Sequence, residues 1–428
     1  MSQRAGDAAA SERTLPDEQH PQPPELRMHK GPWYWIGWVA VWLFLVAIVA
    51  GAAFLGVVGT RPLPYLPVTA EKIPPTHPIA LSWSGQSSVA VGTADGGVKA
   101  TAGSQAQRPT ASIAKVITVL VVASVHPLAV GSDGASITMG AADVAQIGAV
   151  ESAGGVALPV SRGQVWTQRQ MLDGILLVSA NNLANSYAIW AFGSMRAYHD
   201  AAMNWLAAQG LKNTVVGSDA CGLDPATRST PSDLFALGTK LMADPGLRDI
   251  VSQQHATGPG GLALDNTNAL IGQDGFIGIK TGTMSVAGYC LLFANKLQVD
   301  GQTVLVIGVV LNEPSDPARF QAAQALVAFM KNNIVPTDVV AGQTFGYVTD
   351  LDGHAVPIVA ASGIPGVRMR DQIVTVRLTV TRLDMPVADG TPVGTVTVGD
   401  TTVPLVVGSA IPSGDLGWRL EHLHELIW

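Results

Sequence analysis

A serine and a lysine stand three residues apart where an apolar stretch of the chain begins. Ser112 and Lys115 are followed by the apolar run Val116–Val122. Apolar residues this dense predict a buried helix, and positions i and i+3 of a helix lie on one face. A serine hydroxyl is a weak nucleophile that needs a neighbouring base, and a lysine desolvated among apolar side chains has a lowered pKa that suits it to this role. Because Ser-x-x-Lys also occurs as an ordinary helix start, the pair predicts catalysis only in combination with other motifs.

Two more short motifs follow further along the chain. Ser179 and Asn181 stand between two apolar stretches with helical spacing, where serine and asparagine most often act as caps. Lys280 and Thr281 open a Lys-Thr-Gly-Thr run within residues 276–283, whose composition predicts a strand. Each motif is weak by itself, so the argument depends on their order, spacing and structural context.

The segments around these motifs predict a domain of helices and antiparallel strands. A capping box and a proline at a first helical position mark two helix starts, and apolar alternation between turn residues marks the strands. The elements expected in this α/β (α+β) domain, residues 79–335, are a hairpin within 79–103, helices starting near 112, 167 and 230, a stretch of loops and short elements at 131–165, strands at 276–283, 287–295 and 304–311, and a helix over 317–332 that packs on the sheet.

The character of the sequence changes after Pro336. Residues 374–380 alternate apolar side chains with threonine and arginine, and residues 393–407 continue as short strands with turns. This pattern predicts a separate small all-β domain over residues 336–428.

The N-terminal part predicts a membrane anchor. Residues 1–32 are polar and proline-containing, which is typical of a disordered tail, whereas residues 33–58 are apolar and uncharged. About twenty apolar residues are enough to cross a bilayer, and a cleavable signal peptide has a shorter apolar region, so we expect an uncleaved transmembrane helix. Residues 59–78 contain six prolines and predict a stiff linker to the next domain.

Charges on either side of this helix indicate its direction. Four cationic residues precede it and two follow closely, an imbalance that the positive-inside rule associates with a cytoplasmic N-terminus. The domains after residue 60 are then expected outside the cytoplasm, held at the cell membrane by a single span.

Composition argues against several other classes of function. The chain of 428 residues has a formal net charge of −7 and contains no basic run, which argues against a nucleic-acid partner. Its two cysteines exclude a disulfide-dense scaffold and a Cys-x-x-Cys zinc module, and its histidines are scattered, so neither a metal site nor a cofactor is expected. Cys221 and Cys290 could pair in an exported domain, but a glycine-containing loop around the first and a buried strand around the second favour two free thiols.

In this order and context, Ser112-x-x-Lys115, Ser179-x-Asn181 and Lys280-Thr281-Gly282 resemble the three motifs of the penicilloyl-serine (β-lactamase/transpeptidase-like) fold. On these motifs the chain resembles the D-alanyl-D-alanine carboxypeptidases among the low-molecular-mass penicillin-binding proteins. The likeness continues in Lys212-Asn213-Thr214, in Gly222-Leu223, in Ala287–Cys290 and in Met385–Gly390, and it covers roughly residues 79–420.

The resemblance implies a serine peptidase that removes the terminal D-alanine from peptidoglycan stem pentapeptides of a bacterial wall. Ser112 would attack the carbonyl carbon, Lys115 would take its proton, and Ser179 would relay a proton to the leaving D-alanine. The backbone N–H groups of Ser112 and Thr283 would form the oxyanion hole, and β-lactam inhibitors would acylate the same serine. The residues that the resemblance implies in substrate binding are Asn181, Lys280, Thr281, Gly282, Thr283 and Arg319.

Three features depart from the pattern of this family. Asn182 stands where the family often has aspartate, and Met284 where it usually has a small hydroxyl residue. Many relatives are held by a C-terminal amphipathic helix, whereas the expected anchor here is N-terminal. The tail 417–428 nevertheless has enough apolar residues to rest on a membrane surface.

Other functions of the same fold stay open at this point. A serine β-lactamase is disfavoured because no glutamate stands in a recognisable deacylation motif, although Glu151 is in the broad region. A D,D-endopeptidase would use the same residues on crosslinked peptides, and the sequence does not separate the two substrates. A non-catalytic, wall-binding scaffold is disfavoured because the motif residues are intact.

Overall fold

The computed structural model of the chain describes residues 31–61, 63–71, 77–83, 85–337 and 339–427. The chain divides into two compact units. The first comprises residues up to Leu66 with Asp384–Val387 and Pro412–Trp428, and the second comprises Pro67–Leu383 and Ala388–Ile411. Most of the tail expected to be disordered, residues 1–30, lies outside the described residues.

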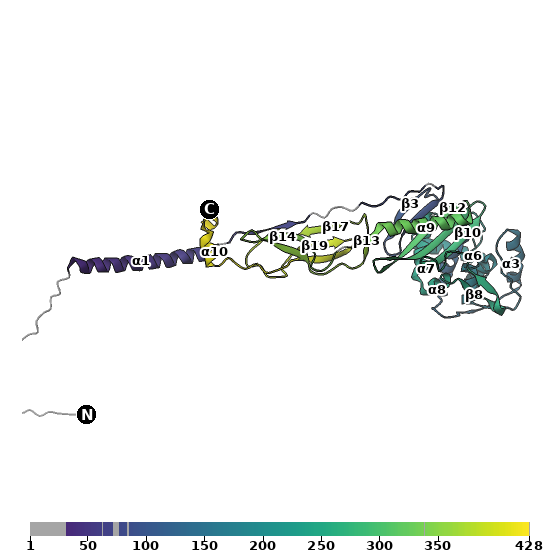
Figure 1. Cartoon of the computed structure of the whole chain (residues 1–428). Coiled ribbons are helices and arrows are strands. Elements are labelled where there is room, and N and C mark those ends of the chain that lie inside the picture. Colours follow the sequence, from purple (N-terminus) through teal and green to yellow (C-terminus); the bar gives the residue numbers. More distant parts are fainter. Residues whose placement is uncertain (1–30, 62, 72–76, 84, 338, 428) are drawn as a thin grey trace, which may run out of the picture. The chain divides into compact units, whose positions relative to one another are not determined.

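A five-stranded antiparallel sheet organises the N-terminal part of the second unit, in the order β10-β11-β12-β2-β3. Figure 1 labels its strands β3, β12 and β10. The three strands expected between residues 276 and 311 form its β10-β11-β12 meander, and the hairpin around Asp95-Gly96-Gly97 adds the last two strands. The strands are β2 (Ser88–Thr93), β3 (Gly97–Ala102), β10 (Phe276–Met284), β11 (Gly288–Val299) and β12 (Gln302–Glu313).

Helices cover both faces of this sheet, as the alternation of buried side chains along β11 requires. Leu291 and Phe293 pack with Leu326 of the helix that follows the sheet, whereas Leu292 belongs to the core shared with the other helices. The expected helix over 317–332 is thus confirmed as α9, and it lies on the sheet (Figure 1). The helices are η1 (Ala111–Ile113), α2 (Ala114–Ala123), α3 (Ala141–Ser152), α4 (Gln168–Leu176), α5 (Asn181–Phe192), α6 (Met195–Ala208), α7 (Pro231–Ala243), α8 (Pro245–Val251), η2 (Pro259–Gly261) and α9 (Asp316–Asn333).

The expected helix starts are confirmed in detail. The Thr167 hydroxyl accepts the Gln170 backbone N–H at 3.2 Å while the Gln170 side chain accepts the Thr167 N–H at 3.0 Å, which is a capping box. Pro231 occupies the first turn of α7, where its missing N–H costs nothing. Short two-stranded ribbons connect the helices: β4 (Arg108–Pro109) with β7 (Arg228–Ser229), β5 (Ser136–Thr138) with β6 (Val165–Thr167), and β8 (His255–Thr257) with β9 (Ala263–Asp265).

One helix lies where the sequence showed only loops and short elements. The helix α3 has twelve residues, begins after Gly140, and has the Asp143 carboxylate bound to the Gly140 N–H at 2.7 Å. Val150 is its one buried residue. A helix with so little buried surface needs no apolar period, so periodicity could not reveal it.

Of the all-β domain expected over residues 336–428, the strands up to Val407 are confirmed by a seven-stranded sheet in the order β17-β19-β20-β15-β14-β1-β18, whereas residues 416–427 form helices and lie in the first unit. Two further strands, β13 (Ile334–Pro336) and β16 (Val367–Met369), pair with each other. The strands of the large sheet are β1 (Leu66–Ala70), β14 (Thr344–Thr349), β15 (Ala355–Ala360), β17 (Val374–Leu378), β18 (Arg382–Leu383), β19 (Pro392–Val398) and β20 (Thr401–Val407).

The expected linker over residues 59–78 was wrong in one part, because β1 lies within it. Val68 pairs with Val348 of β14, and the buried Leu66 and Val68 alternate with exposed neighbours. Prolines at positions 64 and 67 suggested an extended spacer, but an extended chain with alternating apolar side chains also suits a short strand.

The first unit contains a long apolar helix and two short C-terminal helices. They are α1 (Pro32–Thr60), α10 (Leu416–Glu421) and α11 (Leu423–Ile427). The Arg419 guanidinium donates from Nη1 to the Val58 carbonyl at 3.0 Å and to the Arg61 carbonyl at 2.7 Å. A cation is favourable at a helix C-terminus, so Arg419 of α10 stabilises the end of α1.

Candidate active site

Ser112 lies in the 3₁₀ turn that precedes α2, and its hydroxyl is bonded to Lys115. Lys115 Nζ donates to Ser112 Oγ at 2.8 Å, and the lysine side chain is completely buried. Ala111, directly before the serine, has a φ of +46°, a conformation that L-residues rarely adopt and that is often kept at functional sites. The structure therefore brings the serine and the lysine of the first motif within hydrogen-bonding distance of each other.

A second acceptor holds the same ammonium group. Lys115 Nζ also donates to the Cys221 carbonyl oxygen at 3.0 Å. Burial lowers the pKa of Lys115 to about 8, while the nearby Cys221 and Asp219 act in the opposite direction. A lysine with this pKa gives up its proton near neutral pH far more easily than an exposed lysine, which a general base requires.

The third motif lies on β10, directly beside the serine turn. A β-carbon on Gly282 would lie 3.2 Å from the Ser112 backbone nitrogen and 3.0 Å from the Thr110 carbonyl, so glycine permits this close approach. Thr283, the next residue, is exposed at the end of the strand. The backbone of β10 and the turn that carries Ser112 therefore line one site.

Lys280 is the second buried lysine of the site. Its side chain is 1% exposed, and its Nζ donates to the Thr281 carbonyl at 3.1 Å. Burial, followed by the positive charges of Lys115 and Arg319, holds the pKa of Lys280 well below its usual value. A concentration of positive charge of this kind binds an anion favourably.

Arg319 of α9 contacts the strand. Its Nη1 donates to the Gly282 carbonyl at 3.2 Å and to the Thr283 hydroxyl at 3.1 Å, and its Nη2 forms an ion pair with Asp316. The buried guanidinium thus orients Thr283, and the direct substrate contact that the resemblance implies for Arg319 stays a prediction.

The second motif has Ser179 in the loop between α4 and α5 and Asn181 as the first residue of α5. Ser179 is buried with a φ of +72°, again a strained backbone position. Asn181 accepts the Val156 N–H at 3.2 Å and lies within hydrogen-bonding reach of the Cys221 thiol, next to the carbonyl that receives Lys115. Asn182, the departure from the family pattern, pairs through both ends of its amide with the Leu158 backbone at 2.9 and 3.0 Å.

Sequence reasoning missed three residues of the site. The Cys221 carbonyl has no signature in the residue type, since every residue carries one. Asp219 stands three residues before Gly222, a turn signal that could have been noticed. Thr267 donates to the Leu177 carbonyl at 3.1 Å and lies 2.7 Å from the Thr281 hydroxyl, so it links the third motif to the loop of the second, but its polar loop gives no distinctive pattern.

Both cysteines are free and buried, as the sequence favoured. Glu151, the residue considered for deacylation, is exposed on α3.

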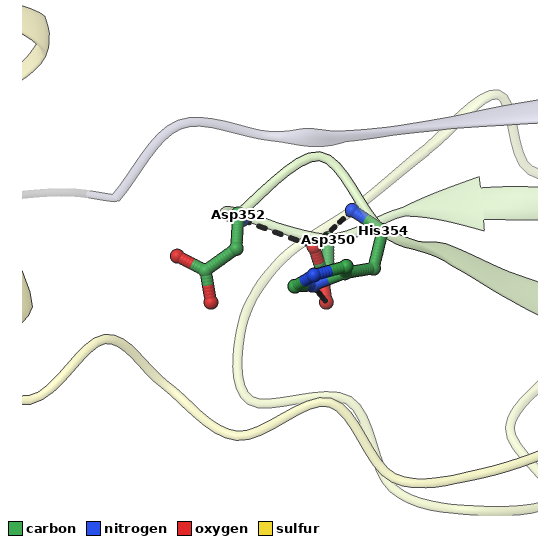
Figure 2. Close-up of side chains that lie close together, drawn as sticks. All are labelled: Asp350, Asp352 and His354. Carbon is green, nitrogen blue, oxygen red and sulfur yellow. Dashed lines mark hydrogen bonds and ion pairs between the residues drawn. The ribbon is translucent and has the colours of Figure 1, made fainter.

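A separate group of potential ligands lies in the turn between β14 and β15. The ligand atoms of Asp350, Asp352 and His354 lie within 4.8 Å of one another (Figure 2). Asp350 Oδ1 accepts the backbone N–H groups of Asp352 at 3.0 Å and of His354 at 2.7 Å. These bonds close the turn and account for the position of the aspartate.

The fold and the buried serine–lysine pair define a serine-type peptidase. The sequence profile of the D-alanyl-D-alanine carboxypeptidase family (peptidase family S11) matches residues 74–315, more than half of the chain, and the chain belongs to this family.

Known relatives agree with this assignment. The chain is 34% identical over 184 residues to a D-alanyl-D-alanine carboxypeptidase of Streptomyces sp. strain K15, a match that covers 39% of this chain and 62% of the relative. The crystal structure of the Streptomyces K15 DD-transpeptidase aligns with a TM-score of 0.50 at 26% identity, over 56% of this chain and 95% of that one. The D-alanyl-D-alanine carboxypeptidase DacD from Francisella tularensis shares the fold, with a TM-score of 0.55 at 19% identity over 81% of this chain and 98% of that one.

Proposed function

We propose that the protein is a D-alanyl-D-alanine carboxypeptidase that cleaves peptidoglycan stem pentapeptides through an acyl-enzyme on Ser112. The observation that carries the proposal is the 2.8 Å bond between Lys115 Nζ and Ser112 Oγ at a buried lysine whose pKa is lowered to about 8. A neutral lysine in this place accepts the serine proton as the oxygen attacks.

The proposed reaction has two stages. Ser112 Oγ bonds to the carbonyl carbon between the two D-alanines, its proton passes to Lys115, and the carbonyl oxygen becomes an oxyanion between the N–H groups of Ser112 and Thr283. The C–N bond then breaks as the leaving nitrogen takes the proton from Lys115 by way of Ser179, which returns Lys115 to its neutral form. Water finally hydrolyses the ester on Ser112 and restores the serine, with Lys115 again as the base. One oxyanion-hole donor contributes about 3–4 kcal/mol in well-studied enzymes.

The strand β10 supplies the expected binding of the terminal carboxylate. Lys280, Thr281 and Thr283 would hold this group by charge-assisted hydrogen bonds, and Arg319 would keep Thr283 in place. Burial and then the positive charges of Lys115 and Arg319 depress the pKa of Lys280, and these charges support the role because a bound carboxylate relieves their repulsion. Asn181 would hold the backbone of the stem peptide, and β-lactams, which carry a similar carboxylate, would acylate the same serine.

The experiment is the release of free D-alanine from a pentapeptide by the purified chain. The wild type should release D-alanine, and Ser112→Ala should release none and should lose covalent labelling by a fluorescent penicillin while its melting temperature stays nearly unchanged. If the wild type releases no D-alanine, the alternative of a non-catalytic, wall-binding scaffold is favoured. Rapid hydrolysis of the penicilloyl-enzyme, in milliseconds instead of minutes to hours, would indicate a β-lactamase.

The same assay separates peptidases of this fold. The K15 relative is described as a DD-transpeptidase, so an added amine acceptor should be tested for transfer in competition with water. A crosslinked dimer as substrate tests D,D-endopeptidase activity. Preferential release of D-alanine from the monomeric pentapeptide supports the carboxypeptidase.

We further propose that α1 anchors the protein in the membrane with its N-terminus in the cytoplasm. Among the described residues, α1 is the one helix that is long and apolar enough to span a bilayer, a test that a signal sequence near the N-terminus also passes. The excess of cations before the helix supports this direction. The intact mass of the protein recovered from the membrane fraction shows whether α1 is retained as an anchor or removed as a signal sequence. Digestion of the domain that contains Ser112 by protease added to spheroplasts tests the direction of α1 across the membrane.

A further inference from the structure

The loop that receives Lys115 is built around one carboxylate. Asp219 Oδ1 accepts the backbone N–H groups of Cys221 at 2.9 Å and Gly222 at 2.6 Å, and Asp219 Oδ2 accepts that of Asp224 at 2.6 Å. Three N–H groups converge on a single ionised side chain, an arrangement in which each bond is stronger than one between neutral groups. The direction of the Cys221 carbonyl is therefore fixed by Asp219.

This loop is joined to α2 at two successive carbonyls. Lys115 and Thr118 lie one turn apart on α2, and they donate to the carbonyls of Cys221 at 3.0 Å and Ala220 at 2.6 Å. Gly222 has a φ of +80°, and a β-carbon there would lie 2.1 Å from the Ala111 carbonyl, beside the nucleophile. The loop has no room to shift without disturbing the turn that carries Ser112.

The charge of Asp219 also acts on the base. The titratable groups around Lys115 are Asp219 and Cys221 in this loop and Lys280 on β10; Tyr198 of α6 is influenced by the same loop groups. Burial lowers the pKa of Lys115, whereas Asp219 raises it. Replacing the carboxylate by a neutral group should therefore lower this pKa further and move the pH dependence of base catalysis to lower pH.

A second carboxylate in the same loop shows what an ordinary turn residue looks like here. Asp224 binds the Ser218 N–H at 2.8 Å and the Ala226 N–H at 2.9 Å, close to solvent. It does not figure among the groups that shift the pKa of Lys115. Asp219 differs because it holds the carbonyl that Lys115 uses.

We propose that Asp219 is a positioning residue for the reaction, which holds the Cys221 carbonyl against Lys115 so that the ammonium and Ser112 Oγ keep their alignment. This inference rests on the proposed function, in which Lys115 is the base.

The test uses 4-nitrophenyl acetate, a neutral ester that does not need the carboxylate contact with Lys280. The rate of acylation is followed from pH 6 to 10 by the burst of 4-nitrophenol from the purified full chain, with Ser112→Ala as the blank. The variants are Asp219→Asn, Asp219→Glu and, as a control for the loss of one negative charge, Asp400→Asn in the exposed turn between β19 and β20.

We expect the rising limb of the wild-type profile near pH 8, and a shift of about half a pH unit or more to lower pH in Asp219→Asn, because a change in pKa moves the limb by the same amount. Asp219→Glu retains the charge but displaces it by one methylene, so its plateau rate should fall at least about tenfold. Asp400→Asn should match the wild type in both respects.

The inference is overturned if the acylation rate of Asp219→Asn rises at the same pH as that of the wild type, or if the maximum rate of Asp219→Glu equals that of the wild type. If Asp219→Asn does not fold, as shown by its melting curve, the plateau of Asp219→Glu decides. A burst that persists in Ser112→Ala contradicts the proposed function instead, so the two failures are distinguishable.

Discussion

The two buried lysines of the site are close in space but differ in their surroundings. Lys115 donates to two acceptors, Ser112 Oγ and the Cys221 carbonyl, and has Asp219 nearby. Lys280 donates within its own strand to Thr281, and the charges that shift its pKa are both positive. The hydrogen-bond partners of Lys115 are therefore in place in the free protein. The surroundings of Lys280, in contrast, favour the binding of an anion. From these surroundings we propose that proton transfer and carboxylate binding belong to different lysines.

The largest expected effect is that of removing the base. Lys115→Ala should lower the acylation rate by roughly 10²–10⁴-fold, the range of general-base catalysis, with a penicillin and with a neutral ester alike, because both depend on the same serine. Lys240→Ala, which removes a lysine bonded to Gln209 on the surface, is the control and should leave both rates unchanged. If Lys115→Ala lowers the acylation rate with the penicillin but not with the ester, Lys115 acts in carboxylate binding, and the two lysines do not have separate roles.

A smaller and selective effect is expected from Arg319. Arg319→Met removes a cation beside Lys280 and the donor that orients Thr283, so penicillin acylation should fall about 10–100-fold, in line with the loss of a charged hydrogen bond. The neutral ester should lose much less. Second-order acylation rates with the two reagents give the comparison, and an unchanged penicillin rate would show that Thr283 does not need Arg319.

The pH dependence should separate the two lysines in the wild type. With a pKa of about 8, roughly a tenth of Lys115 is neutral at pH 7 and most of it at pH 9, so the ester rate should rise about tenfold over this interval. Burial and neighbouring positive charges lower the pKa of Lys280, so it loses its proton more readily than an exposed lysine as the pH rises, and this loss weakens only carboxylate binding. The ratio of the penicillin rate to the ester rate should therefore fall as the pH rises, and a constant ratio would contradict separate roles.

A buried carboxyl group outside the site, that of Asp173, is expected to affect the stability of the fold and not the acylation rate. Burial raises the pKa of Asp173 in α4 to about 6, and its Oδ1 has no hydrogen-bond partner among the described residues. The folded protein thus binds this proton more tightly than the unfolded chain, so the stabilisation exists at pH 4 and is lost as the pH rises through 6. Asp173→Asn should raise the free energy of unfolding at pH 8, relative to pH 4, by up to about 3 kcal/mol.

Chemical denaturation of Asp173→Asn and wild type at both pH values measures this difference. The acylation rates of the variant should equal those of the wild type. A difference in the free energy of unfolding between variant and wild type that is the same at pH 4 and at pH 8 would contradict the raised pKa of Asp173.

The sequence predicted those parts of the molecule whose residue types are restricted by chemistry or periodicity. The serine and lysine at helical spacing, the Lys-Thr-Gly strand and the alternating strands of both sheets could be located in this way. The helix α3 and the strand β1 could not, since one has almost no buried face and the other lies among prolines. The Cys221 carbonyl and its support by Asp219 were missed because backbone acceptors and loop carboxylates acquire their roles only through tertiary structure.

The measurement that tests the division of roles most directly uses Lys280→Ala with two acylating reagents. Second-order acylation rates are determined for wild type and variant with a penicillin, which carries the carboxylate, and with 4-nitrophenyl acetate, which does not. The penicillin rate should fall by an amount equivalent to roughly 2–5 kcal/mol, the cost of removing one partner of a buried charge pair, while the ester rate should change little. Equal losses with the two reagents would mean that Lys280 acts on the nucleophile or on the fold, and would contradict its assignment to the carboxylate.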